Sequence, residues 1–488
     1  MTTVTRIAPS PTGNLHIGTV RTALYNILFA KRNAGKFFFR LEDTDTQRST
    51  KEFEEEIIAG FKWLGLEWDS PKGLEHEDGL ENNGMVRQSK RNIRHQEIIT
   101  GLLEKKLAYK CYTTPEEMDE LRKEQRAAKK AEGYDNRGRD YSEDQIQGFE
   151  AADKKFVIRL NLAEDRDIKW NDLVRGEMSI NTRDLGGDPV IQKFNGQVLY
   201  NFAVVADDSD MNVTHVIRGE DHLTNTAKQI AICQVAGLKI SEFGHLPLIF
   251  TKDKQKLSKR KHGDIAGVDK YKNEGYLPEA LVNYLIASSY TDQVDPEKEI
   301  YSLDEACKTF DHKGISKSPA IYDIQKLNWF NREYMTRFSN DDFLAACSPY
   351  LNYDFDSKFS KEQRDLILES VRGNLDTFSD IDNEINYFFE KPSVPEKLQS
   401  FLDGGQDLLK AISASIEADK YDFNNAAALK EAINAIGEEM GLSGKKLFFP
   451  IRIAISSRSG GPDLGVIMHL LGKEETLSRL ESSVNVTV

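Results

Sequence analysis

The stretch RIAPSPTGNLHIGT, residues 6–19, places a histidine and a hydroxyl in a turn rich in proline and glycine. It lies between the apolar run VTRI and the helical pattern VRTALYNILFAKR. The start of a helix has unpaired backbone N–H groups and the positive end of the helix dipole, and both attract anions. His16 and Thr19 would share one face of the first turn, and Gly18 would let a ring or phosphate approach the backbone. The segment suits an anion-binding turn, but taken alone these residues favour the alternative, an ordinary helix cap with a surface histidine.

A second segment that could act on phosphate is TKDKQKLSKRKHGD, which begins at Thr251. Six of the ten residues from Lys252 to Lys261 are lysine or arginine, against one aspartate. Cleavage of a triphosphate spreads negative charge over the leaving pyrophosphate, and lysines on a closing loop can stabilise that charge. We interpret the segment as a mobile basic loop; the alternatives are a solvated run of charge or a general phosphate-binding patch.

The elements that must position these segments alternate between strands and helices. VTRI and KFFFRLE, with the helical residues 20–32 between them, predict a β-α-β unit. Strand-like segments resume at KFVIRLNL and QVLYNFAVVADD, and residues 213–237 have the pattern of strand, loop and helix. These patterns predict one α/β domain interrupted by an insertion of roughly a hundred residues. From about Ser339 onward the periodicity is helical.

Composition limits the class of protein. With 488 residues, of which 39% are hydrophobic and 30% charged, the sequence predicts a multidomain globular protein. It has no apolar run of about 18 residues and no signal-like start, so we expect a cytoplasmic protein without a membrane span. The formal charge of -14 argues against indiscriminate nucleic-acid binding, and any RNA partner must meet local basic patches. The four cysteines lack paired spacing, which is typical of free thiols in a reducing compartment.

In their order along the chain, HIGT and KLSKR resemble the HIGH and KMSKS signatures of class I aminoacyl-tRNA synthetases. More specifically, APSPTGNLHIGTVRTALYN, RLEDTD, WLGLEWD, VIRGEDHLTNT and HLPLI resemble the bacterial-type glutamyl-tRNA synthetases. The resemblance continues through KSPAIYDIQKLNWFN to GKKLFFPIRIAISSRSGGPDL and covers nearly the whole chain. It implies a multidomain fold: an α/β Rossmann-type catalytic domain with an inserted α+β domain, followed by an all-α carboxy-terminal anticodon-binding domain.

The resemblance also implies where the domains lie. The Rossmann-type catalytic domain would occupy residues 1–110 and 196–250, interrupted by an acceptor-binding connective domain at 111–195. A stem-contact region carrying the KLSKR loop would follow at 251–335, and the helical anticodon-binding domain at 336–488. The implied enzyme is a ligase that activates L-glutamate with ATP to glutamyl-adenylate and transfers the glutamyl group to the 3′ end of tRNA(Glu). It would act as a cytoplasmic monomer, with Mg²⁺ accompanying ATP and no membrane partner.

Functional residues carry over at matching positions. The residues implied in catalysis are His16, Thr19, Lys256 and Lys259. Those implied around glutamate are Arg6, Ala8, Ser10, Glu42, Tyr200 and Arg218. Those implied around ATP are His16, Gly18, Asp221, Ile249, Lys256 and Lys259. Arginine suits a carboxylate because its guanidinium can donate two parallel hydrogen bonds, so Arg6 and Arg218 would bind carboxylate oxygens and Glu42 the ammonium group.

Alternatives remain for some of these residues. Taken alone, Glu42 could be a strand-end carboxylate in a surface salt bridge, and Arg218 could form a structural ion pair with Glu220 or Asp221. For function, the alternatives are a non-discriminating form that also glutamylates tRNA(Gln), and a non-catalytic tRNA-binding paralogue. The intact lysine and histidine signatures argue against the paralogue.

The insertion departs from relatives that carry a zinc knuckle, with a Cys-x-Cys pair followed by a later Cys and His. Here the corresponding text is KCYTT and YDNRGRD, in which only Cys111 remains. Structural zinc requires four such ligands. The sequence therefore predicts no zinc and no other protein-bound metal.

Overall fold

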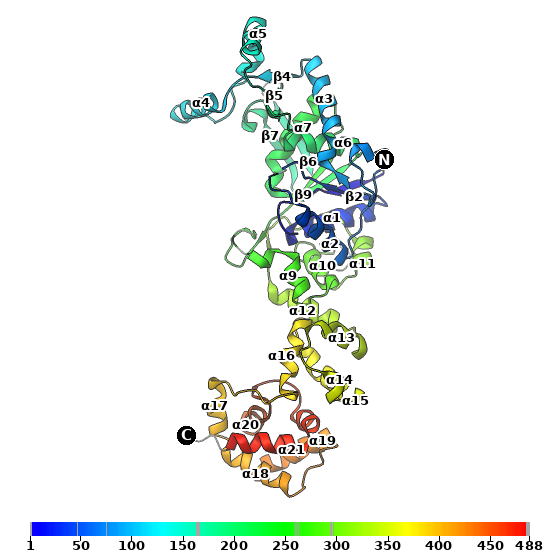
Figure 1. The fold of residues 1–488 in the computed structure, drawn as a ribbon, viewed down its shortest axis with the longest axis vertical. Helices are drawn as coiled ribbons and strands as arrows, with labels where there is room; N and C mark the ends of the chain where they lie inside the picture. Colours follow the sequence, from blue (N-terminus) through cyan, green and yellow to red (C-terminus); the bar gives the residue numbers. More distant parts are fainter. Residues whose placement is uncertain are drawn as a thin grey trace. The chain divides into compact units, whose positions relative to one another are not determined.

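The computed structural model divides the chain into two compact units (Figure 1). One unit is Met1–Lys270 with Leu281–Ile324, and the other is Tyr271–Ala280 with Gln325–Val488. The residues that the structure describes are 2–45, 47–74, 76–162, 166–258, 261, 263–292, 295 and 297–484.

The first unit begins with the predicted β-α-β unit. Strands β1 (Val4–Ile7) and β2 (Lys36–Leu41) pair in parallel, and helix α1 (Ile17–Arg32) connects them. β2 continues the sheet to the short strand β3 (Val86–Arg87), also in parallel. Parallel strands need a crossover connection, which α1 provides while burying most of its own side chains.

The α/β pattern restarts after the insertion, as predicted. Strand β9 (His215–Gly219) pairs in parallel with β10 (Glu242–Leu246), and helix α7 (Leu223–Ala236) connects them. The backbone N–H of Thr214 donates to the carbonyl of Val4 at 2.9 Å, so β9 runs beside β1. The chain therefore leaves β1 and β9 toward opposite edges of the sheet, to β2 and to β10. In such a sheet a crevice for ligands forms outside the carboxyl ends of the two strands.

The strand predicted from QVLYNFAVVADD is wrong for most of its length. Residues Tyr200–Asp210 form helix α6, which follows Leu199 in an extended conformation. Phe202 through Asp208 are all buried. A helix buried on nearly every side has no polar face, so its sequence lacks the 3.6-residue alternation that marks a surface helix.

The region predicted as the insertion combines helices with antiparallel strands. Its elements in chain order are β4 (Ala108–Cys111), α4 (Pro115–Ala127), α5 (Glu143–Ala151), β5 (Val157–Leu160), β6 (Asp167–Asp172), β7 (Gly176–Asn181) and β8 (Val190–Gln192). β4, β5 and β8 form one antiparallel sheet, and β6 and β7 form a hairpin. This agrees with the α+β class, whereas the exact domain boundaries stay a prediction.

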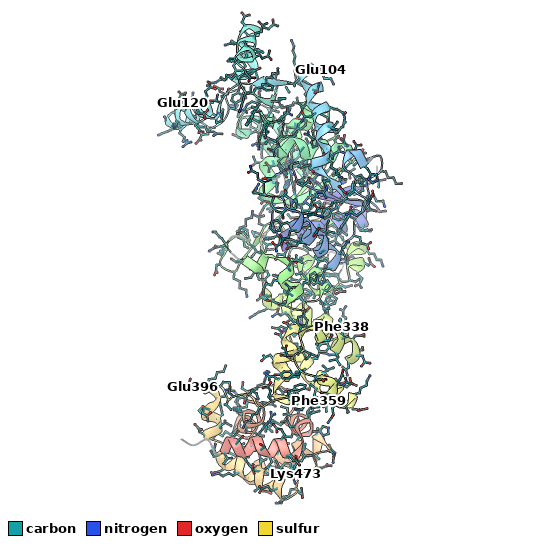
Figure 2. The ribbon with its side chains drawn as sticks, viewed as in Figure 1. Glu104, Glu120, Phe338, Phe359, Glu396 and Lys473 are labelled. Carbon is teal, nitrogen blue, oxygen red and sulfur yellow. The ribbon has the colours of Figure 1, made fainter. Side chains whose placement is uncertain are left out.

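The second unit is helical, which confirms the predicted class of the carboxy-terminal region. Its longer helices are α12 (Ile324–Met335), α13 (Asn340–Cys347), α15 (Lys361–Val371), α17 (Glu396–Asp403), α18 (Gln406–Glu417), α19 (Ala426–Glu439), α20 (Lys445–Ser456) and α21 (Leu464–Val484, interrupted at Gly472). Aromatic side chains contribute to its core, as where Phe359 packs edge-on against Phe389 with ring centroids 5.5 Å apart. Phe359 is labelled in Figure 2. Among the described residues, no helix has the length and apolarity needed to cross a bilayer.

Candidate active site

A pocket of about 460 Å³ lies where β1 and β9 end and α1 begins. The predicted site residues that line it come from both halves of the α/β fold: Arg6, Ala8, Ser10, His16, Gly18, Thr19, Glu42, Tyr200, Arg218, Asp221, Ile249 and Lys256. Lys259 lies outside the described residues. The structure thus brings together every predicted site residue that it describes, while their roles stay predictions.

His16 both caps α1 and lines the pocket. It has an extended backbone, its carbonyl accepts from Thr19 N at 2.8 Å, and its Nδ1 accepts from Gly18 N at 2.9 Å. Because Nδ1 acts as an acceptor, a neutral ring carries its proton on Nε2, which is a donor. The cap uses the N–H groups of Gly18 and Thr19, so this turn offers an anion the Nε2 donor of His16 and the positive end of the helix dipole.

Beneath the pocket lies a buried network of charges. Arg6 donates to both carboxylate oxygens of Asp208, and Arg40 donates to the same carboxylate at 2.5 Å. Arg40 also donates to Glu42 at 3.0 Å. These four side chains are at most 7% exposed. The surface salt bridge considered for Glu42 is wrong, because its partner Arg40 is completely buried.

The network is balanced against the cost of burial. For Arg40, burial alone would lower the pKa, but the negative charges of Asp208 and Glu42 outweigh it and raise the pKa. For Glu42, burial dominates and raises the pKa despite the nearby Arg40 and Arg6. Because burial disfavours the charged form of Glu42, a further cation beside it, such as a ligand ammonium group, would stabilise that form.

Arg218, at the end of β9, is a buried cation with unused donors. Its Nη2 donates to Thr226 Oγ1 at 2.6 Å and to Gln229 Oε1 at 2.8 Å. Its Nε and Nη1 are buried and have no hydrogen-bond partner among the described residues. Burial lowers the pKa of Arg218 to about 10, so it remains charged at neutral pH. A buried guanidinium with unpaired N–H donors can bind an anionic group such as a carboxylate.

The structural ion pair considered for Arg218 is also wrong. Glu220 accepts from Arg175 and from Leu248 N, and Asp221 accepts from Lys256 Nζ at 2.8 Å. Burial alone would raise the pKa of Asp221, but the hydrogen bond from Lys256 lowers it. The first lysine of the KLSKR segment is thereby held at the rim of the pocket.

Some pocket residues were not predicted. Arg21 is 3% exposed and donates to Ser289 Oγ at 2.8 Å and to Pro247 O, which joins α1 to later parts of the unit. His222 also lines the pocket, and burial together with the nearby charge of Arg218 lowers its pKa to about 4. The signal for His222 was its place in the segment VIRGEDHLTNT.

Cys111, the cysteine discussed for the insertion, belongs to a cluster centred on a tyrosine. Cys111 Sγ lies 3.1 Å from Tyr134 Oη, and Gly138 N donates to the same hydroxyl at 2.8 Å. A phenol oxygen thus lies between Cys111 and Gly138. Among the described residues, no group of three or more His, Cys, Asp or Glu side chains could hold a metal ion.

Comparison with known proteins agrees with this geometry. The family described as tRNA synthetases class I (E and Q), catalytic domain, matches residues 2–329, and an anticodon binding domain matches 342–484. The glutamate--tRNA ligase of Limosilactobacillus fermentum is 38% identical, with 98% of this chain and 97% of that protein covered. The one from Bacillus mycoides is 39% identical, with 98% of each covered.

Solved structures give the same result. The crystal structure of a glutamate tRNA ligase from Elizabethkingia meningosepticum, in complex with its amino acid, superposes with a TM-score of 0.84 at 34% identity, and each chain is covered completely. A glutamate-tRNA synthetase from Elizabethkingia anophelis gives 0.83 at 34% identity, again with complete coverage. The chain belongs to the glutamate--tRNA ligases, within the class I tRNA synthetases.

Proposed function

We propose that this chain activates L-glutamate with ATP to glutamyl-adenylate and transfers the glutamyl group to the 3′ end of tRNA(Glu). The family and the fold support this reaction, and the pocket contains groups of matching charge. Adenylate formation needs positioning and charge stabilisation more than a covalent nucleophile. The pocket suits this need, because cationic and acidic side chains converge on it from both halves of the α/β fold.

The observation that carries the proposal is the pair of unused donors on Arg218. They would receive the side-chain carboxylate of glutamate, while Glu42 would receive its ammonium group. A site built to donate to a carboxylate discriminates against a neutral amide, because glutamine would leave the buried cation unpaired. Arg6 would add a second cation beside the bound amino acid.

ATP would lie along the start of α1 and the KLSKR segment. His16, at the positive end of the α1 dipole, would contact phosphates, and Lys256 with Lys259 would stabilise the charge that develops on pyrophosphate. Mg²⁺ would accompany ATP and offset the charge of its phosphates, and few protein carboxylates line the pocket that would receive it. The helical second unit would bind the anticodon region of the tRNA. We infer a cytoplasmic monomer.

The test is Arg218→Gln, which keeps two amide donors and removes the charge. We expect kcat/KM for glutamate to fall at least about a hundredfold, because a buried charge pair is lost. The assay is glutamylation of tRNA(Glu) and tRNA(Gln), each alone, so that the same experiment measures tRNA choice. Arg94→Gln is the control, since Arg94 is 41% exposed and pairs with Asp210 and Glu97 outside the pocket. Unchanged glutamate kinetics in Arg218→Gln would show that Arg218 does not recognise the carboxylate and would assign that role to Arg6.

A further inference from the structure

Arg218 is held by a chain of buried hydrogen bonds that begins in the insertion. Asp172, the last residue of β6, bonds to His245 Nδ1 at 2.5 Å, and His245 Nε2 bonds to Thr226 Oγ1 at 2.9 Å. Thr226 Oγ1 in turn accepts from Arg218 Nη2 at 2.6 Å. Asp172, His245 and Thr226 are each at most 2% exposed. This series of hydrogen bonds therefore connects the β6–β7 hairpin to the guanidinium proposed to recognise glutamate.

The direction of each hydrogen bond follows from its neighbour. A carboxylate only accepts, so the short contact requires a proton on His245 Nδ1. Burial lowers the pKa of His245 despite the adjacent Asp172, so the ring is neutral at pH 7 and Nε2 has a lone pair. Thr226 then donates its single proton to Nε2, and its own lone pairs face Arg218. A second acceptor, His222 O, is farther from Thr226 Oγ1, at 3.2 Å.

Asp172 is itself fixed by backbone donors. Its Oδ1 accepts from Val174 N, Arg175 N and His245 N, each at 3.0 Å. The turn of the hairpin also adds to the edge of the sheet, because Leu173 N donates to Phe243 O at 2.8 Å. These bonds fix the carboxylate of Asp172, and the carboxylate in turn orients the imidazole of His245.

The second partner of Arg218 is oriented in the same way. Gln229 Oε1 accepts from Arg218 while its Nε2 donates to Asn201 Oδ1 at 3.1 Å. Thr226 and Gln229 both bind Nη2, so the guanidinium is held through one nitrogen. The other two nitrogens, Nε and Nη1, are left for a ligand.

We propose that Thr226 and His245 are positioning residues for glutamate recognition, and that Asp172 anchors them from the hairpin. They touch no substrate. They hold Arg218 through Nη2, so that its Nη1 and Nε donors stay available to the side-chain carboxylate. The inference rests on the proposed function and adds to it the residues that give Arg218 its geometry.

The test is Thr226→Val, which replaces the hydroxyl by a methyl group of similar shape. The readout is the Michaelis constant for glutamate and, separately, for ATP, in ATP–pyrophosphate exchange with tRNA(Glu) present. A hydrogen bond to a charged group is lost, so we expect the constant for glutamate to rise about tenfold or more. The constant for ATP should stay within about twofold, because the hydrogen-bond partners of Thr226 among the described residues are Arg218, His222 and His245, none of which belongs to the proposed phosphate site. Thr226→Ser keeps the hydroxyl and should restore wild-type kinetics.

Ser241→Ala is the matched control. Ser241 is 9% exposed, precedes β10, and donates to Val213 O at 2.9 Å without contacting Arg218. The Ser241→Ala variant lacks a buried hydroxyl beside the same sheet and should leave both Michaelis constants unchanged. If Thr226→Val does not fold, Thr226→Ala and Thr226→Ser form the comparison, since both lack the methyl group and only the first lacks the hydroxyl.

The possible outcomes separate the two proposals. A glutamate constant that stays within twofold in the hydroxyl-deficient variant overturns the positioning role. Glutamate and ATP constants that rise together also overturn it, because they indicate general loss of structure. Absence of glutamate-dependent exchange in the unsubstituted chain would instead overturn the proposed function, and this inference with it.

Discussion

Asp208 accepts from Arg6 Nε and Nη2 at 3.2 and 3.0 Å, so one carboxylate closes both ends of the guanidinium fork. The same carboxylate accepts from Arg40 Nη1. It is the shared partner of two buried arginines that come from β1 and β2, while Asp208 itself lies on α6. The floor of the pocket therefore depends on a residue that no substrate needs to touch.

Replacing Asp208 with Asn should destabilise the first unit strongly. Removing one partner of a buried pair leaves an uncompensated buried charge, which costs about 3–5 kcal/mol, and here two cations lose their partner. Glutamate activation should fall as Arg6 and Arg40 repel each other. Urea unfolding and ATP–pyrophosphate exchange measure the two effects. Glu55→Gln is the control, because the exposed pair Lys51–Glu55 should contribute less than about 0.5 kcal/mol. Similar stability losses in both variants would contradict the prediction.

Replacing Lys259 with Ala should slow adenylate formation far more than it weakens glutamate binding. The lysine is proposed to stabilise charge that develops on the phosphates only in the transition state, so kcat should fall with little change in KM for glutamate. Rapid-quench measurement of adenylate formation tests this. Lys252→Ala is the control, since Lys252 belongs to the same basic segment and pairs at the surface with Asp323. If only the KM for tRNA rises, the segment is an RNA contact.

Stability should fall in acid because of Asp207. Burial alone would raise its pKa, but the hydrogen bond from His95 and the charges of Arg40 and Arg91 lower it to about 2. The unfolded carboxylate binds a proton near its ordinary pKa of 3.8, before the folded one does. The contribution of Asp207 to the free energy of unfolding is therefore complete above about pH 5. About 2 kcal/mol of that free energy is lost as pH falls toward 2.

The measurement is the free energy of unfolding of the unsubstituted chain and of Asp207→Asn between pH 3 and 6. The variant lacks the titrating group, so its stability should depend less on pH. Parallel curves for the two proteins would show that Asp207 does not titrate in this way.

Tyr134→Phe should destabilise the insertion. It removes the hydroxyl that accepts from Gly138 N, and an unsatisfied buried donor costs about 1–3 kcal/mol. Tyr141→Phe is the matched control, because its contact with Thr113 is longer, at 3.3 Å, and partly exposed to water. Hydrogen exchange of the insertion measures both. Elemental analysis of chain purified without chelator should find no zinc, and stoichiometric zinc whose removal unfolds the insertion would refute the proposed tyrosine-centred cluster.

Much of the site could be predicted because its residues lie at element ends that have local signals. The turn before α1 is marked by proline, glycine and histidine, and Arg218 is the penultimate residue of the short strand β9, which ends at Gly219. These signals depend on neighbours in sequence. Residue identity at such positions is therefore informative without knowledge of tertiary packing.

The supporting network could not be predicted in the same way. Asp207 and Asp208 end an apolar run that suggested a strand, whereas they lie on a buried helix and bind arginines more than a hundred residues away. Nothing local marks His245 as the link between Asp172 and Thr226. Long-range pairing of buried charges is decided by tertiary packing, and a single sequence shows only that the charges stand in apolar surroundings.

The separation of Arg6 from Asp208 along the chain sets an order for biosynthesis. The two residues are 202 positions apart, so at about 5–20 residues per second the carboxylate follows its partner by about 10–40 s. During that interval the nascent β1–α1–β2 segment already contains Arg6 and Arg40, while Glu42 can neutralise only one of them. Its native packing must wait for translation of α6, and until then its apolar surfaces are available to chaperones.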